Sequence, residues 1–158
     1  MNERSAYAIY CEDAREEVHG KVSLMGIYAD YAIFSKFPAN VSKFVIVVFA
    51  NTSRSNPFKT LKFRAKAGNH VLGEMDIDQN NIQEDLAASP VDLEDIQVKV
   101  QMVFTPISVN KPCKVYVEVI TESETLTTRP LIFETSERKD IPIPVLREVE
   151  GKLPENLA

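Results

Sequence analysis

Acidic and amide side chains alternate near the middle of the chain with the spacing that a calcium-binding loop uses. Asp76, Asp78 and Asn80 would place oxygen ligands at alternate positions of such a loop. The match then fails, because Asn81 stands where the loop needs a glycine and Ala87 stands where it needs a bidentate glutamate. Aspartate and asparagine are also frequent in turns, so we favour a solvated turn and keep a metal site as the alternative.

Three cationic side chains alternate along a segment that has the pattern of a strand. Lys62, Arg64 and Lys66 would share one face of that strand, with about 7 Å between neighbours, and could bind phosphate or an acidic partner. No aromatic residue is interleaved on that face to stack bases, and the whole chain has a net charge of −5. Nucleic acid is therefore not expected as a partner, and an exposed outer face is the simpler interpretation.

A third cluster of polar side chains lies between the first two predicted strands. Glu12, Asp13 and Arg15 precede His19 and Lys21, a mixture that superficially suits general acid–base chemistry. Both histidines of the chain adjoin turn residues, and the sequence shows no nucleophile elbow, phosphate-binding glycine loop or pair of histidines at metal spacing. We therefore expect a loop that contributes binding residues, with no catalytic residue and no cofactor.

The last candidate is the segment from residue 135 onward, in which two prolines alternate with apolar residues. Pro142 and Pro144 lack the N–H that a strand inside a sheet must donate, so this tail is expected to be extended. Extended proline-containing segments can lie along a partner's surface at a small entropic cost. The tail could equally pack on its own body, and in either case the expected contacts are made by Ile141, Ile143, Val145 and Leu146.

Short strands with turns between them account for most of the remaining sequence. The clearest is residues 96–104, where Val98 and Val100 alternate with Lys99 and Gln101. About eight such strands and the lack of a long amphipathic helix predict a mostly-β fold, a two-sheet antiparallel β-sandwich over residues 1–134. A short helix is expected in the crossover at 78–95 and an extended tail at 135–158. The candidate strands are residues 5–11, 22–28, 32–34, 43–50, 59–67, 70–77, 96–104, 113–121 and 126–134.

Length and composition set the class of protein. With 158 residues, 44% of them hydrophobic and 26% charged, the chain has the size and balance of one globular domain. Its longest apolar run, residues 44–50, is far shorter than a membrane-spanning helix, and no secretory signal pattern is present. A cytoplasmic protein without a membrane partner is therefore expected. Cys11 and Cys113 lie in apolar surroundings with no second cysteine nearby and are expected to be free thiols.

The N-terminal residues also resemble a known sequence pattern. Cys11-Glu12-Asp13 is followed by Gly20-Lys21 and then by Ser23-Leu24-Met25-Gly26-Ile27-Tyr28. This order resembles the opening of a family of small uncharacterised bacterial proteins, which has a Cys-acid-Asp segment, a Gly-Lys pair and a Ser-Leu-x-Gly-x-Tyr motif. The resemblance implies a relative without implying a function. Among the positions that it singles out, Asp13 and Arg15 could pair with each other or bind loop backbone amides.

These observations lead to one expected function and two alternatives. We expect a non-enzymatic protein-binding or scaffolding module that self-associates, with the tail as a contact. The first alternative is a sandwich that binds a ligand or calcium in the loops at one end. The second, by analogy alone, is a phage or mobile-element protein that binds a host or defence protein. The expected binding residues are Glu12, Asp13, Arg15, Lys21, Tyr28, Lys62, Arg64 and Lys66.

Overall fold

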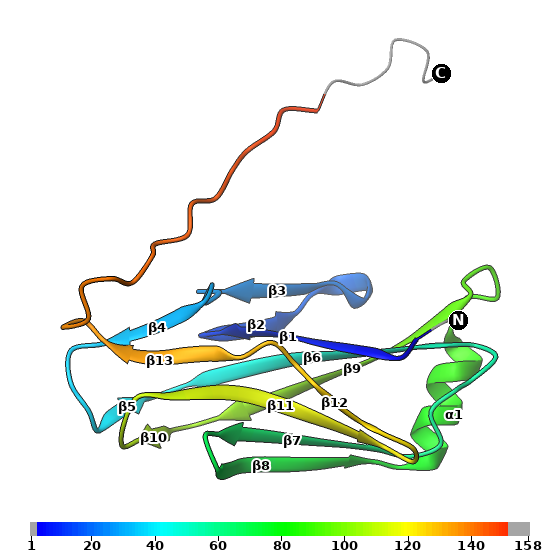
Figure 1. The fold of residues 1–158 in the computed structure, drawn as a ribbon. Coiled ribbons are helices and arrows are strands. Elements are labelled where there is room, and N and C mark those ends of the chain that lie inside the picture. Colours follow the sequence, from blue (N-terminus) through cyan, green and yellow to red (C-terminus); the bar gives the residue numbers. More distant parts are fainter. Residues whose placement is uncertain (1–2, 152–158) are drawn as a thin grey trace.

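The computed structural model describes residues 3–151, and two β-sheets packed face to face make up its body (Figure 1). In the first sheet, β6 (Phe44–Ser53) lies between β1 (Ser5–Cys11) and β9 (Asp95–Phe104). The second sheet has the order β4-β13-β11-β7-β8, and β12 also pairs with β11. Its strands are β4 (Tyr31–Phe34), β7 (Leu61–Ala67), β8 (His70–Ile77), β11 (Cys113–Thr121), β12 (Thr125–Thr127) and β13 (Leu131–Thr135).

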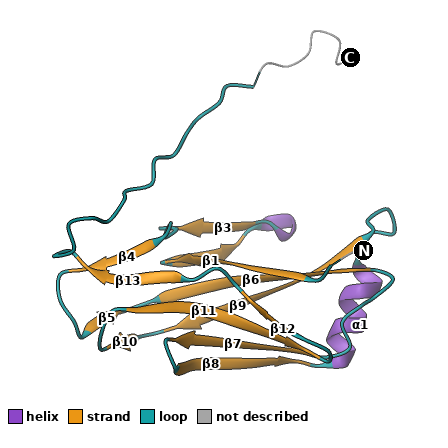
Figure 2. Cartoon of the chain, viewed as in Figure 1, coloured by secondary structure: helices purple, strands orange, loops and turns teal. Residues whose placement is uncertain are grey.

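Smaller elements complete this mostly-β architecture, which confirms the predicted antiparallel sandwich with a short helix (Figure 2). Helix α1 (Gln79–Ala88) lies in the crossover between β8 and β9. A hairpin is formed by β2 (Asp13–Glu16) and β3 (Val22–Met25), and β5 (Ala39–Val41) pairs with β10 (Ile107–Val109). Across residues 3–151, no helix combines the length and the apolar character needed to cross a membrane.

Strand β6 is buried on both faces along most of its length. Phe44, Ile46 and Val48 belong to the core between the two sheets. Val45 and Val47 point the other way, into a smaller cluster that the β2–β3 hairpin covers. A strand covered on both faces gains from apolar residues at every position, which explains the uninterrupted apolar run in this part of the sequence.

The core between the sheets is built from every second residue of the other strands. In β11, Val115, Val117 and Val119 are fully buried while the residues between them are partly exposed. Aromatic rings extend this core toward β13, where the ring centroids of Phe44 and Phe133 lie 5.7 Å apart in an edge-to-face arrangement. The alternation seen in the sequence therefore corresponds to one face on the core and one face outside.

The segment predicted as a loop between the first two strands, residues 12–21, instead contains strand β2, which forms a hairpin with β3. Asp13 to Glu16 has weak strand propensity, but Ala14 packs with Leu24 over Val45 and Val47, and this burial outweighs propensity. Strand β3 ends at Met25, so the predicted strand over residues 22–28 is too long at its C-terminal end. The following residue, Gly26, has a φ of 63°, which breaks the extended conformation.

The predicted strand over residues 126–134 is also divided, into β12 and β13. Pro130 has no N–H to donate, and Thr128 leaves the strand path to turn inward, where it is 2% exposed. Its backbone N–H donates to the carbonyl of Val117, and its hydroxyl accepts the N–H of Val117. After this interruption β13 pairs in parallel with β4, a departure from the antiparallel pairing expected throughout.

Two valine substitutions test the assignment of inner and outer faces. Val117→Ala should lower the free energy of unfolding by about 2 kcal/mol, because it removes fully buried methyl groups and leaves a cavity. Val103→Ala is the matched control, since that side chain is 48% exposed, and should cost about 0.5 kcal/mol or less. Urea denaturation of both variants measures the difference, and equal losses would contradict the assigned faces.

Candidate functional site

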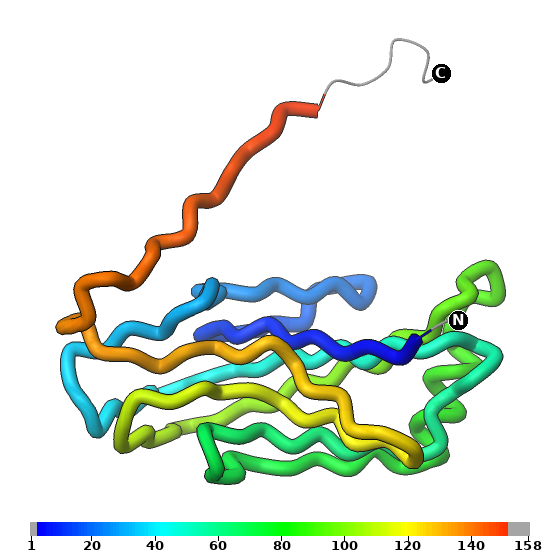
Figure 3. The backbone as a smooth tube through the Cα atoms, in the orientation of Figure 1, coloured from blue at the N-terminus to red at the C-terminus, as the bar shows by residue number. Residues whose placement is uncertain are grey.

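The C-terminal tail carries several highly exposed apolar residues. Residues 141–151 form no helix or strand and lead away from the body (Figure 3). The tail touches the body as far as Pro142, which lines a shallow pocket beside Tyr31. Beyond it, Ile143 is 87% exposed, Val145 79% and Leu146 97%, whereas Ile141 is partly buried. The described tail residues past Pro142 are therefore not packed on their own body.

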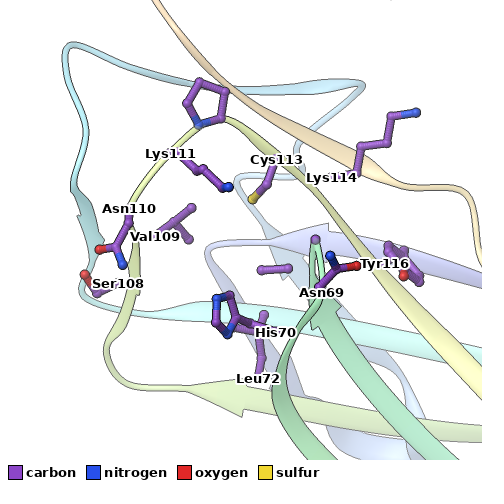
Figure 4. A pocket seen from close by; sticks show the side chains of 13 residues that line it. Asn69, His70, Leu72, Ser108, Val109, Asn110, Lys111, Cys113, Lys114 and Tyr116 are labelled. Carbon is purple, nitrogen blue, oxygen red and sulfur yellow. The ribbon is translucent and has the colours of Figure 1, made fainter.

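A cavity of about 880 Å³ lies at one end of the sandwich, where the β7–β8 turn meets the connection between β10 and β11 (Figure 4). The side chains of Asn69, His70, Lys111 and Cys113 surround it, while the amine of Lys114 points away from its centre. Among the lining residues that the structure describes, none is an aspartate or a glutamate. The predicted binding residues do not line this cavity. In the sequence, this region showed only the residues typical of turns, such as Gly68-Asn69.

The thiol of Cys113 lies beside this cavity. It is free and partly buried, and burial raises its pKa while the charge of Lys111 lowers the pKa by a smaller amount. The thiol is therefore protonated at neutral pH, and a thiol in this state is a weak nucleophile. This environment suits binding better than nucleophilic catalysis.

The β2–β3 hairpin brings part of the predicted acidic cluster together. Asp13 lies 2.5 Å from Nζ of Lys43 and 3.4 Å from Nε of Arg15, and its carboxylate also accepts the backbone N–H of Ala14, so it makes both of the contacts considered from the sequence. The hydrogen bond from Lys43 lowers the pKa of the Asp13 carboxyl. Lys21 lies at the turn of the hairpin, where its carbonyl accepts the N–H of Glu17. The cluster holds the hairpin on the body.

Glu12 and Tyr28, two other predicted binding residues, have structural contacts. The side chain of Glu12 occupies the space beside Gly26, where an added Cβ would lie 2.6 Å from Oε2 of Glu12. Tyr28 is packed against the main core with its ring centroid 5.9 Å from that of Phe44, and its N–H donates to the carbonyl of Tyr10. Burial raises the pKa of the Tyr28 hydroxyl. These contacts explain much of the N-terminal pattern without a ligand.

The cationic stripe of β7 faces acidic residues of the neighbouring strands. Nε of Arg64 lies 2.6 Å from Glu74 of β8, and Nζ of Lys66 lies 3.5 Å from Glu118 of β11. Lys62 also approaches Glu74, at 3.9 Å. The hydrogen bond with Arg64 lowers the pKa of Glu74, so the carboxylate stays charged opposite the cations. Lys62, Arg64 and Lys66 therefore form cross-strand pairs and do not present an uncompensated positive face.

The residues with calcium-loop spacing lie at the end of β8 and the start of α1. The carboxylate of Asp76 is 3.7 Å from Nζ of Lys62. Asp78 is the N-cap of α1, and its side chain accepts the backbone N–H of Asn80 at 2.8 Å. Residues 3–151 contain no group of three histidine, cysteine, aspartate or glutamate side chains placed to hold a metal ion. The alternation of acidic residues here is explained by an ion pair and a helix cap.

An ion pair between the buried Arg4 and the more exposed Glu122, which sequence reasoning missed, joins the N-terminus to the second sheet. Arg4 is 8% exposed, lies 2.6 Å from the carboxylate of Glu122 and donates hydrogen bonds to the carbonyls of Asn56 and Pro57. Its guanidinium also lies over the ring of Phe58. These partners are distant in the sequence, so no local pattern reveals them.

The charge state of Glu122 is controlled by this network. Burial alone would raise its pKa, but hydrogen bonds from its own backbone, from Arg4 and from the N–H groups of Lys59 and Thr60 together lower the pKa to about 2. The carboxylate therefore stays ionised over the whole neutral range. Arg4 and the N–H groups of Lys59 and Thr60 all contact this carboxylate, so the network connects the N-terminus to the second sheet.

Comparison with known proteins places the chain in a family. A family model described as Family of unknown function (DUF6941) matches residues 6–134. The chain belongs to this family. In the DUF6941 match the aligned residues run from β1 into β13, so they cover both sheets and the end cavity, and the tail after residue 134 lies outside them. No curated protein matches the chain.

The Arg4–Glu122 pair predicts an acid-sensitive fold. The pKa of Glu122 is lowered from 4.5 to about 2 in the folded protein, so its stabilising contribution is complete above pH 4.5 and is lost as the pH falls toward 2. Glu122→Gln should lower the free energy of unfolding at pH 7 by about 1 to 3 kcal/mol and should flatten its decline between pH 4.5 and pH 2.

Asp13→Asn is the comparison variant, because it also breaks an ion pair with a cation, but the side chain of its cation, Lys43, is 44% exposed whereas that of Arg4 is 3% exposed. Its effect on the free energy of unfolding should be smaller. Urea denaturation across this pH range compares the two variants. If the free energy of unfolding of Glu122→Gln declined with pH as it does in the wild-type chain, the Arg4–Glu122 pair would not control acid stability.

Proposed function

We propose that this chain is a non-enzymatic protein-binding module that assembles with other copies of itself through its C-terminal tail. The exposure of the tail's apolar side chains carries the proposal, above all that of Leu146 at 97% and Val149 at 88%. Burying a side chain of this size contributes about 1.5–3 kcal/mol, so a run of such residues represents a large unused binding energy. A second copy is a partner that is present wherever the chain is.

The use of charged side chains in the body supports a binding role. Arg4 and Glu122 connect the N-terminus to the second sheet, and Asp13 and Lys43 hold the hairpin. These charged groups pair with other groups of the body, whereas the apolar side chains of the tail remain exposed. A reciprocal exchange of tails between two copies would bury both of them and would close the assembly as a symmetric dimer.

Two paired substitutions in the full chain test self-association. Val145→Asp combined with Leu146→Asp places charges on the tail and should convert the assembly to a monomer, because burying an unpaired carboxylate is costly. Val91→Asp combined with Leu93→Asp changes the same residue types at exposed positions outside the tail and should leave the mass unchanged. Light scattering during gel filtration measures both, and a monomeric wild-type chain would refute the proposal.

The end cavity favours a second candidate function, the binding of a small anionic ligand. Its size lies within the range of small-molecule sites. Lys111 supplies a positive charge, Asn69 supplies amide groups for hydrogen bonds, and no carboxylate lines the described cavity to repel an anion. This candidate does not depend on the tail.

Inorganic phosphate is a suitable probe of the cavity. In a nuclear magnetic resonance titration, phosphate should shift the amide signals of Gly68, Asn69 and Lys111 more than chloride does at equal ionic strength. Lys111→Glu should abolish these shifts, because it replaces the cation of the cavity with an anion. Lys139→Glu, a change of the same charge outside the cavity, should preserve them. Shifts that are equal in phosphate and chloride would exclude an anion site.

A further inference from the structure

The order of prolines in the tail restricts how this segment can bind. In an extended strand, residues two apart point their side chains to one face and their backbone N–H and C=O groups to one edge. Ile141, Ile143 and Val145 therefore share an edge that keeps its N–H donors, whereas Pro142 and Pro144 occupy the opposite edge without donors. Such a strand can pair with a sheet on one side and cannot be extended on the other side.

The same pattern fits a polyproline helix less well. A polyproline II helix has three residues per turn, so residues two apart do not share a face in it. In a strand, by contrast, the apolar side chains of Ile141, Ile143 and Val145 form one continuous face. The period of two therefore favours pairing with a sheet edge over docking in a groove.

Among the described strands, β9 offers the longest regular edge for such pairing. It is the outer strand of the first sheet, and its ten residues pair with β6 without a shift in register. The outer strand of the second sheet on that side, β8, is interrupted by a register shift opposite Ala65 and Lys66. At the other edges of the two sheets, β4 is short, with four residues, and part of the edge of β1 is already occupied, because the carbonyl of Tyr10 accepts the N–H of Tyr28.

The residues of β9 suit an apolar strand beside them. Val98, Val100 and Met102 face the core and are buried, and β9 contains neither proline nor glycine to interrupt pairing. The backbone groups of Val98, Val100 and Met102 are directed to β6, so a strand added in the parallel direction would bond to the residues between them and continue this inner face with Ile143 and Val145. Unpaired edges of this kind are templates for strand addition from another chain.

The tail's own β9 is poorly placed to accept it. The tail follows β13, which lies next to the β4 edge of the second sheet, whereas β9 lies against the opposite edge of that sheet, where Gly73 of β8 is beside the ring of Phe104. The described tail also leads away from the body (Figure 1). The geometry points to strand addition between copies: residues 143–147 of one copy pair along β9 of a second copy as a terminal edge strand. This inference rests on the proposed self-association through the tail.

Hydrogen exchange in the assembled full chain tests the pairing directly. The amides of Ile143, Val145 and Arg147 should exchange about tenfold or more slowly than those of Leu146 and Glu148, because they alone point to the paired edge. Amides of β9 that do not bond to β6 should also become protected. An assembly without this alternation would overturn strand addition and leave self-association standing, whereas a chain that stays monomeric would overturn both.

Two proline substitutions provide a matched test in the same chain. Arg147→Pro removes an N–H from the paired edge and should weaken assembly about fivefold, which is about 1 kcal/mol. Leu146→Pro removes an N–H from the opposite edge within the same segment and should have a smaller effect. Arg147→Ala and Leu146→Ala correct for the loss of each side chain. Equal weakening by the two prolines, measured as dissociation constants by light scattering, would overturn the assigned edge.

Discussion

Burial of β6 on both faces is the constraint on which the rest of this structure depends. Phe44, Ile46 and Val48 require the second sheet on one side, and Val45 and Val47 require the β2–β3 hairpin on the other. Removing a valine side chain from water contributes about 1.5–3 kcal/mol, more than the weak strand propensity of β2 opposes. The hairpin is therefore part of the sandwich, and the N-terminal pattern of the sequence is largely explained by the need to cover this strand.

The charged residues of the body are arranged around this framework. Arg4 and Glu122 connect the N-terminus to the second sheet, and the cations of β7 face acids on both neighbouring strands. Within residues 3–151, the apolar tail and the cavity at one end lie outside this framework. Binding energy is available in these two regions, because their groups are not already paired within the chain.

Strands with one face on the core were predictable from the sequence, because apolar and polar residues alternate along a strand whose two faces are buried and exposed. The predicted ranges 5–11, 70–77 and 113–121 coincide with β1, β8 and β11. Strand β2 was not predictable, since its residues pair because of what they cover. The stripe of Lys62, Arg64 and Lys66 was correctly placed on one strand face, but its acidic partners come from other strands, so only the structure reveals its compensated charge.

The sequence by itself determined the fold class, the strand faces of the core and the exclusion of the tail from the inside of a sheet. Each of these follows from local chemistry: side-chain period, turn residues and the missing N–H of proline. The tertiary structure alone decided the parallel pairing of β13 with β4, the pairing of Arg4 with Glu122, and the end cavity around Lys111 and Cys113. These features join residues far apart in the chain, and such contacts exist only after the sheets have packed and brought their ends and edges together.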